Sequence, residues 1–260
     1  MIKIDQYFSQ AQWQKFTQAA EGQETPLLVV DLSRIKTKYE EMVTLFPKAK
    51  IHYAMKASPA TEVVKYLADL GSNFDCASIY ELDRVLDCGV TADRISYGNT
   101  IKKAVHIKYA YNKGIDLYAT DSKADLINIA NNAPGSKVFV RILVHGADTA
   151  EWPLSRKFGC HPDMAIDLLV QAKNLGLVPY GISFHVGSQQ KDDALAKVKY
   201  MFDWMKYEEG IKLQMINLGG GFPTNYISEV NPISVYAEEI HRYLSEDFDE
   251  DEMPEIILEP

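Results

Sequence analysis

Six places in the sequence carry chemically capable residues at the end of a short run of β-prone residues or directly after it. They are Lys56, Asp75, Arg141, His185, Gly219–Gly221 and Glu259. Amines and imidazoles can form covalent bonds or transfer protons, and a guanidinium or a glycine-rich loop can hold an anion. A charged side chain beside an apolar strand needs a partner or a ligand, because an unpaired buried charge is very costly. These positions are therefore candidates for a functional site.

Lys56 follows the mostly apolar run Ile51–Met55 and precedes a candidate helix start at Ser58–Pro59. A buried lysine among neighbouring cations loses its proton more readily and can form a Schiff base with an aldehyde. The alternative is a lysine whose stem lies along the strand end while its ammonium group reaches water. Lys56 taken by itself favours this alternative.

The triplet Gly219–Gly221 joins the run Met215–Leu218 to the next helical segment. Consecutive glycines allow backbone N–H groups to converge on an anion without interference from Cβ atoms. The alternative is a flexible turn, and the triplet alone does not decide between the two.

His185 ends the run Gly181–His185, in which alternation places Gly181, Ser183 and His185 on one face. Small residues beside a histidine indicate space for a ligand, although an isolated histidine is more commonly structural. Ser188, three residues further along, could donate to a phosphate.

Asp75, Arg141 and Glu259 are not accounted for by helix starts or by surface position. By contrast, Ser78 and Glu81 match a capping box, so the start of a helix alone explains both of them. Salt bridges among the three charged residues are the alternative to ligand binding.

The elements that would position these residues alternate between β-prone runs and amphipathic helical patterns from residue 50 onward. The runs cover residues 51–55, 73–76, 94–97, 116–119, 138–142, 181–185, 215–218 and 255–258. Eight such runs favour an α/β fold of the (β/α)8 barrel type over a doubly wound sheet, and barrels carry their functional groups where strands meet the following loops. The sequence contains neither G-x-G-x-x-G nor a P-loop lysine motif, which argues against a dinucleotide or ATP site.

Residues 1–35 are predicted to form a lead-in, and residues 36–260 the barrel. The patterns predict a helix over 11–20, a strand over 27–31 and a helix that is capped by Ser33 and ends near Phe46–Pro47. Pairs of a capping residue and proline predict helix starts at Ser58–Pro59, His161–Pro162 and Asn231–Pro232. Because the sequence stops after the eighth run, we expect the barrel wall to be open there unless further chain or a partner covers it.

Composition and charge narrow the classes of protein. The 260 residues are 47% hydrophobic and 24% charged, which is typical of a globular chain. The net charge of −9 disfavours a nucleic acid or an anionic membrane as partner. Three cysteines without a CxxC pair, and no apolar run of transmembrane length, lead us to expect a cytoplasmic location.

Five short segments follow one another along the chain: YAMKA at 53–57, FDCAS at 74–78, KFG at 157–159, FHVGS at 184–188 and GGGFP at 219–223. Together they resemble the fold-type III pyridoxal-phosphate decarboxylases, the superfamily of ornithine, lysine, diaminopimelate and arginine decarboxylases, and most of all ornithine decarboxylase. The resemblance implies an alanine-racemase-like barrel that binds pyridoxal 5'-phosphate (PLP), a C-terminal β-domain and a homodimer with shared active sites.

The resemblance also implies catalytic roles for three candidate residues. Lys56 would hold PLP through a Schiff base, His185 would stack on the pyridine ring, and Glu259 would pair with the ring nitrogen. A carboxylate there keeps the ring protonated, and the protonated ring takes up the electrons released when CO₂ leaves.

Cofactor binding would involve the remaining candidates. Asp75 and Arg141 would line the cofactor pocket. The phosphate would be held by Ser188 and by the backbone amides of Gly219, Gly220 and Gly221.

The sequence departs from the family pattern at its end. The family's glutamate-proline segment continues with glycine and a phosphate-binding arginine, whereas this sequence stops at Glu259-Pro260. The C-terminal domain, with its catalytic cysteine, is also absent, and Cys76, Cys88 and Cys160 do not match that cysteine. We therefore expect a barrel fragment of a longer enzyme, and the activity of the 260 residues alone is in question.

Two functions follow from the resemblance. The first is decarboxylation of a basic amino acid, ornithine or lysine, to a diamine for polyamine biosynthesis. The alternative is a non-catalytic PLP-binding protein that acts in regulation or in PLP homeostasis.

Overall fold

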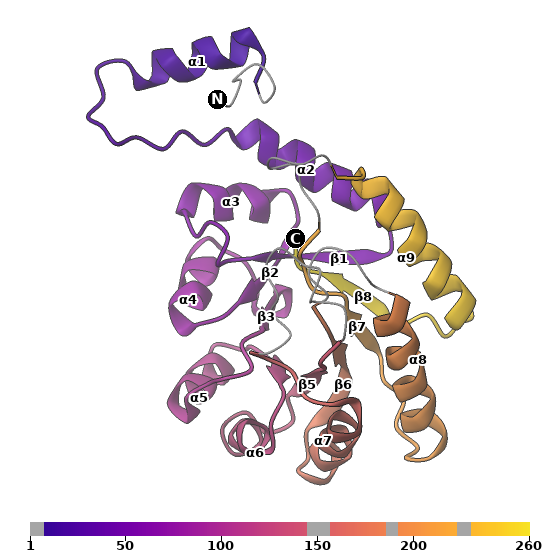
Figure 1. Ribbon diagram of the computed structural model, residues 1–260. Helices are drawn as coiled ribbons and strands as arrows, with labels where there is room; N and C mark the ends of the chain where they lie inside the picture. The colour runs from indigo at the N-terminus through magenta and orange to yellow at the C-terminus, as the bar shows by residue number, and fades with distance from the viewer. Residues whose placement is uncertain (1–7, 145–156, 186–191, 223–229) are drawn as a thin grey trace.

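The computed structural model describes residues 8–144, 157–185, 192–222 and 230–260, and its centre is a closed barrel of parallel strands (Figure 1). The strands are β1 (Ala49–Ala54), β2 (Asn73–Cys76), β3 (Ile95–Tyr97), β4 (Leu117–Thr120), β5 (Lys137–Arg141), β6 (Val178–Ser183), β7 (Met215–Asn217) and β8 (Glu255–Leu258). Each strand pairs with the next along the chain, and β8 pairs with β1 to close the ring. The strands lie at the eight predicted positions, so the (β/α)8 prediction is confirmed.

Helices alternate with the strands and form the outer layer of the barrel (Figure 1). They are α1 (Gln10–Ala20), α2 (Leu32–Leu45), α3 (Thr61–Asp69), α4 (Ile79–Asp87), α5 (Ala104–Asn112), α6 (Lys123–Asn132), α7 (Pro162–Asn174), α8 (Asp192–Tyr207) and α9 (Ile233–Asp247). None of the described helices is both long enough and apolar enough to cross a membrane.

The predicted helix starts are confirmed at two places. His161 caps α7 with Pro162 at its first position. Ser78 caps α4, where its hydroxyl accepts from the backbone N–H of Glu81 at 3.3 Å.

Three other predicted caps are wrong. The N-cap of α2 is Asp31, whose carboxylate accepts from the N–H of Ser33 at 2.9 Å. The N-cap of α3 is Ala60, two residues beyond Ser58, and that of α9 is Pro232. Each observed cap lies within two residues of the predicted one, a difference that is common at helix ends.

The predicted strand over 27–31 is also wrong. These residues have no regular secondary structure, and Leu28 is 86% exposed. A β-rich composition forms a strand only when a neighbouring strand supplies hydrogen bonds, and the described residues place none beside this segment.

The barrel wall is closed by α2, which contradicts the expectation of an open wall. In Figure 1, α2 lies between α3 and α9 on the outer face of β1. Met42 of α2 is buried in the core, and the carbonyl oxygen of Leu45 lies 2.8 Å from Nε2 of His241 on α9. Because β1 and β8 are neighbours, a helix that precedes β1 occupies the place of a helix that would follow β8.

The two-residue period of the strands separates two cores and places the candidate residues. Side chains that point outward, such as Tyr118 and Ile216, pack under the helices. Those that point inward at the lower level, including Phe139, Met215 and Ile257, form a smaller cluster inside the barrel. Two residues further along the same strands, Arg141, Asn217 and Glu259 therefore point inward at the carboxyl end of the barrel.

Candidate functional site

A cavity of about 190 Å³ lies at the carboxyl end of the barrel. Its lining includes the predicted residues Lys56, Asp75, Arg141, His185, Gly219 and Glu259. Gly220 and Gly221 follow Gly219 in the same loop, and Ser188 lies outside the described residues. The barrel thus gathers in one cavity residues that are up to 203 positions apart, from Lys56 to Glu259.

Glu259 is held at the cavity by Asn217 and by the glycine loop. Nδ2 of Asn217 donates to Oε1 of Glu259 at 2.5 Å, and Oδ1 of Asn217 accepts from the N–H of Gly219 at 2.8 Å. The N–H of Glu259 donates to the carbonyl oxygen of Gly219 at 2.9 Å. One buried amide therefore fixes both a carboxyl group and the start of the glycine loop.

The glycine loop approaches its neighbours too closely for side chains. A Cβ atom on Gly219 would lie 2.6 Å from the carbonyl oxygen of Phe184, and one on Gly220 would lie 2.0 Å from that of Glu259. Gly219 also has a φ of +66°, which favours glycine. His185 borders the same loop, since its Nε2 would lie 3.9 Å from a Cβ on Gly220. Gly219 and Gly220 are therefore tightly packed, which favours the anion-binding interpretation of the triplet over that of a flexible turn.

Asp75 is a carboxyl group in a strongly perturbed environment. Burial, followed by the negative charge of Glu259, raises the pKa of Asp75 to about 8. The hydroxyl of Ser96, which donates to Oδ1 at 2.8 Å, and the charge of Lys56 act in the opposite direction. Asp75 can therefore exchange a proton near neutral pH.

Lys56 stands between the two carboxyl groups. It follows β1, which pairs with β2 on one side and with β8 on the other, and these strands lead to Asp75 and Glu259. The residue lines the cavity and is exposed, which agrees with the alternative of a strand-end lysine whose ammonium group reaches water. Because Lys56 is exposed at the cavity, its amine is accessible to a small molecule.

Arg141 ends β5 as a half-buried cation. Its guanidinium lies 5.4 Å from the ring centre of Phe158, within the range of a cation–π interaction. Burial lowers the pKa of Arg141, and the carboxylates of Glu259, Asp121 and Asp75 oppose that shift. Arg141 therefore lies close enough to three acidic residues for their charges to stabilise its charged form.

Gly159 explains the KFG segment. Its N–H donates to Oδ2 of Asp121 at 2.8 Å, and its φ of +96° together with a close approach to the backbone of Ile142 excludes a side chain. The segment thereby places Phe158 against Arg141.

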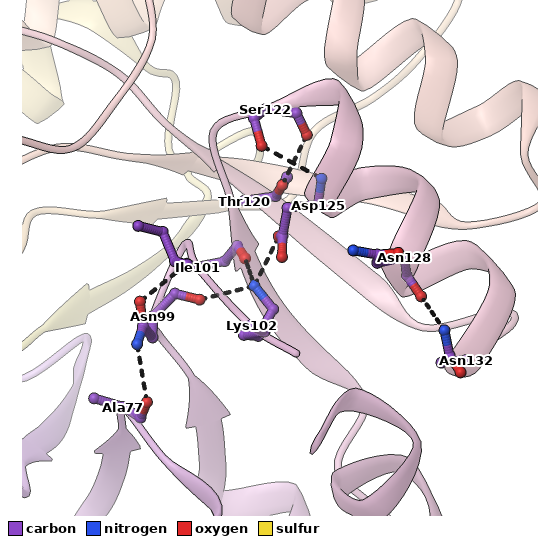
Figure 2. A network of polar contacts seen from close by, with 10 residues as sticks. Ala77, Asn99, Ile101, Lys102, Thr120, Ser122, Asp125, Asn128 and Asn132 are labelled. Carbon is purple, nitrogen blue, oxygen red and sulfur yellow. Dashed lines mark hydrogen bonds and ion pairs between the residues drawn. The ribbon is translucent and has the colours of Figure 1, made fainter. Parts of the chain in front are cut away.

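A buried ion pair holds the loop that follows β3 (Figure 2). The ammonium group of Lys102 donates to Oδ2 of Asp125 at 2.8 Å, to the carbonyl oxygen of Asn99 at 2.7 Å and to that of Ala119 at 2.6 Å. Asn99 donates in turn to the carbonyl oxygen of Ala77 at 3.1 Å. Because Asn99 and Ala77 line the cavity, this network fixes one of its walls.

Sequence reasoning missed Asn217 and Asn99, which line the cavity, and Ser96, which lies behind Asp75. Phe158 was noticed only as part of the KFG segment. An amide in the centre of the apolar run 215–218 was the available signal for Asn217, because asparagine is depleted in strands. Ser96 stands out in the same way in the run 94–97. Nothing in the sequence distinguishes Asn99 from an ordinary loop residue.

Comparisons with known proteins show the family of this chain. Residues 32–260 match the family model described as "Pyridoxal-dependent decarboxylase, pyridoxal binding domain". Ornithine decarboxylase of Saccharomyces cerevisiae is 38% identical over 207 residues, which are 77% of this chain and 44% of the yeast protein. Antizyme inhibitor 2 of Xenopus laevis is 34% identical over 237 residues, which are 89% of this chain and 51% of that protein.

Solved structures show the same fold. Lysine decarboxylase from Selenomonas ruminantium superposes with a TM-score of 0.87 at 32% identity and covers 97% of this chain and 66% of its own. A structure of SrLDC in complex with PLP and cadaverine gives a TM-score of 0.86 at 31% identity, with 97% of this chain and 64% of that chain covered. The chain spans about half the length of the curated relatives it matches.

Proposed function

This chain belongs to the pyridoxal-dependent decarboxylases, and from that premise we propose that the protein decarboxylates a basic amino acid, ornithine or lysine, to a diamine for polyamine biosynthesis. Its cofactor is pyridoxal 5'-phosphate. The gathering of Lys56, Asp75 and Glu259 at neighbouring strand ends in one cavity carries this proposal.

The cavity fits the cofactor in its chemistry. An aldehyde requires an accessible amine, a pyridine nitrogen requires a carboxyl group, and a phosphate requires a backbone that can approach closely. The cavity contains Lys56, Glu259 and a glycine loop in which a Cβ on Gly220 would overlap the backbone of Glu259. The hydroxyl of Thr100, which also lines the cavity, is buried and has no hydrogen-bond partner among the described residues.

The residues would hold the cofactor as the family resemblance implies. Lys56 would bind its aldehyde, Glu259 its ring nitrogen and His185 the ring face, while Arg141 would line the pocket. Gly219, Gly220 and Gly221 would hold the phosphate together with Ser188.

The bound cofactor supplies a protonated ring that takes up the electron pair left on the substrate when CO₂ departs. Asn217 keeps the carboxyl group of Glu259 aimed into the cavity through its 2.5 Å hydrogen bond. Nζ of Lys56 would have to lose a proton before it could bond to the aldehyde, and the ionised form of Asp75, whose pKa is about 8, could accept that proton.

Product analysis tests the proposal. The intact protein loaded with PLP is incubated with ornithine, lysine, arginine or diaminopimelate, and CO₂ and amine products are measured, with the Lys56→Ala variant as the blank. Release of CO₂ and a diamine from ornithine or lysine supports the proposal. PLP binding without CO₂ release from any of the four would contradict it.

The similarity to antizyme inhibitor 2 favours a second candidate, a PLP-barrel protein that acts by binding and not by turnover. The same assay separates the two, because a binder of this kind would release no CO₂. A homodimer with shared active sites and a cytoplasmic location remain part of our proposal, and sedimentation and cell fractionation test them.

A further inference from the structure

A buried serine and a buried histidine lie behind Asp75 inside the barrel. Ser96 on β3 and Asp75 on β2 are direct neighbours in the strand register, and Ser96 is 1% exposed. Its hydroxyl donates to Oδ1 of Asp75 at 2.8 Å. His52 on β1, also buried, places Nδ1 3.3 Å from the same hydroxyl oxygen. The three side chains therefore form a line of hydrogen-bonding groups that ends at the cavity.

The hydroxyl proton of Ser96 has one good acceptor. The alternative acceptor, the carbonyl oxygen of Phe74, is 3.5 Å away, against 2.8 Å for Oδ1 of Asp75. With that proton directed to Asp75, Ser96 can bind His52 only by accepting the N–H of Nδ1. Burial lowers the pKa of His52 to about 3, so the ring is neutral and carries a single N–H, for which the hydroxyl oxygen of Ser96 and the backbone carbonyl oxygen of Phe74 are the acceptors.

Gly98, two residues after Ser96 and just beyond β3, also borders Asp75. A Cβ atom on Gly98 would lie 2.1 Å from Oδ1 of Asp75. A side chain there would displace the carboxyl group. Glycine at this position therefore leaves room for the carboxyl group of Asp75 to accept the hydrogen bond from Ser96.

We propose that Ser96, backed by His52, is a positioning residue that fixes the carboxyl group of Asp75 toward Lys56 and favours its ionised form. The inference rests on the proposed function in one respect, because it assigns Asp75 to the cofactor site. Without Ser96, a larger fraction of Asp75 would be protonated at any given pH, and fewer molecules would carry the ionised carboxyl group that can accept a proton from Lys56.

The charges around Asp75 set the direction of the effect. Glu259 from the end of β8 and Glu81 from α4 favour the protonated form, whereas Lys56 and the hydrogen bond from Ser96 favour the ionised form. Arg141 from β5 also interacts with Asp75. Since Ser96 is uncharged, its removal changes this balance without changing the net charge of the site.

The test measures the titration of Asp75 in the intact protein without cofactor. Carboxyl ¹³C NMR follows the midpoint in the wild type and in Ser96→Ala, Ser96→Thr and His52→Phe, and Asp75→Asn identifies the signal. A charge-assisted hydrogen bond corresponds to a shift of about one pKa unit. We expect the midpoint to rise by about that amount in Ser96→Ala, to rise less in His52→Phe, and to stay close to the wild-type value in Ser96→Thr, which keeps the hydroxyl.

A second readout separates this inference from the proposed function. The pH at which PLP attaches half-maximally, followed by absorbance, should rise in parallel with the NMR midpoint. An unchanged NMR midpoint in both Ser96→Ala and His52→Phe would overturn the inference even if PLP binds normally. A protein in which the NMR midpoint shifts while the wild type fails to bind PLP would support the inference and contradict the proposed function.

Discussion

At the scale of single residues, the site keeps two carboxyl groups beside one lysine, and this arrangement is unfavourable for the protein without cofactor. Burial and the charge of Glu259 make the ionised form of Asp75 costly, so the pKa of Asp75 rises from its ordinary value of 3.8 to about 8. The folded chain therefore binds this proton more tightly than the unfolded chain does. The stabilising effect of that proton is complete below pH 3.8 and is lost as the pH rises toward about 8.

Asp75→Asn should remove this loss of stability. We expect the cofactor-free variant to be more stable than the wild type at pH 8, by on the order of 1–3 kcal/mol, and the difference to shrink as the pH falls toward 4. Urea unfolding at a series of pH values measures the stability difference and its dependence on pH. A variant that is less stable than the wild type at every pH would contradict the assigned environment.

At the scale of elements, the strands were predictable and the loops were not. Runs such as 73–76 and 255–258 coincide with β2 and β8, because β-branched and apolar residues bounded by turn residues are a local signal. The inward position of Asp75 and Glu259 also follows from the two-residue period. Two features could not be predicted: the hydrogen bond from Asn217 to Glu259 and the loop network around Lys102. Both depend on residues that only barrel closure brings together, so no local sequence pattern predicts them.

Gly220→Ala tests the packing of the loop between β7 and α9. The added Cβ would lie 2.0 Å from the carbonyl oxygen of Glu259, so the loop or the end of β8 must move. We expect PLP affinity to fall about tenfold or more, the equivalent of one lost hydrogen bond in the site. The matched control is Gly176→Ala, where φ is +75° but no atom lies within 4 Å. It should cost about 1 kcal/mol of stability and leave PLP affinity unchanged, and equal losses of affinity in both variants would refute the argument.

Lys102→Met tests the buried ion pair of Figure 2. Without the ammonium group, Asp125 and two carbonyl oxygens lose their shared partner inside the protein. We expect a loss of about 3–5 kcal/mol in the free energy of unfolding at neutral pH, measured with urea. The double variant Lys102→Met/Asp125→Leu should recover part of this loss, because no unpaired charge remains. A double variant as unstable as the single one would argue against an effect of the unpaired charge.

At the scale of the whole molecule, the barrel is closed and covered, and a short apolar segment lies apart from it. Residues 27–30 are Leu-Leu-Val-Val, and all four are exposed, Leu28 most of all. Contiguous apolar surface with β-prone composition promotes association between chains. The compact barrel and this segment therefore make opposite contributions to solubility.

Leu28→Lys combined with Val30→Lys should reduce aggregation of the chain in sedimentation velocity experiments. The control is Val105→Lys, which changes a single exposed apolar residue on α5 and should have no effect. If the control reduces aggregation as much as the double variant does, added charge and not the segment is responsible.

The central claim is that the carboxyl end of this barrel binds PLP through Lys56, and chemical trapping tests it most directly. The protein is saturated with PLP, reduced with borohydride and digested, and the peptide that carries the pyridoxyl group is identified by mass spectrometry. We predict that the group is attached to Lys56 and that Lys56→Ala abolishes both the attachment and the accompanying absorbance band. Attachment to another lysine, in the wild type or undiminished in Lys56→Ala, would contradict the account.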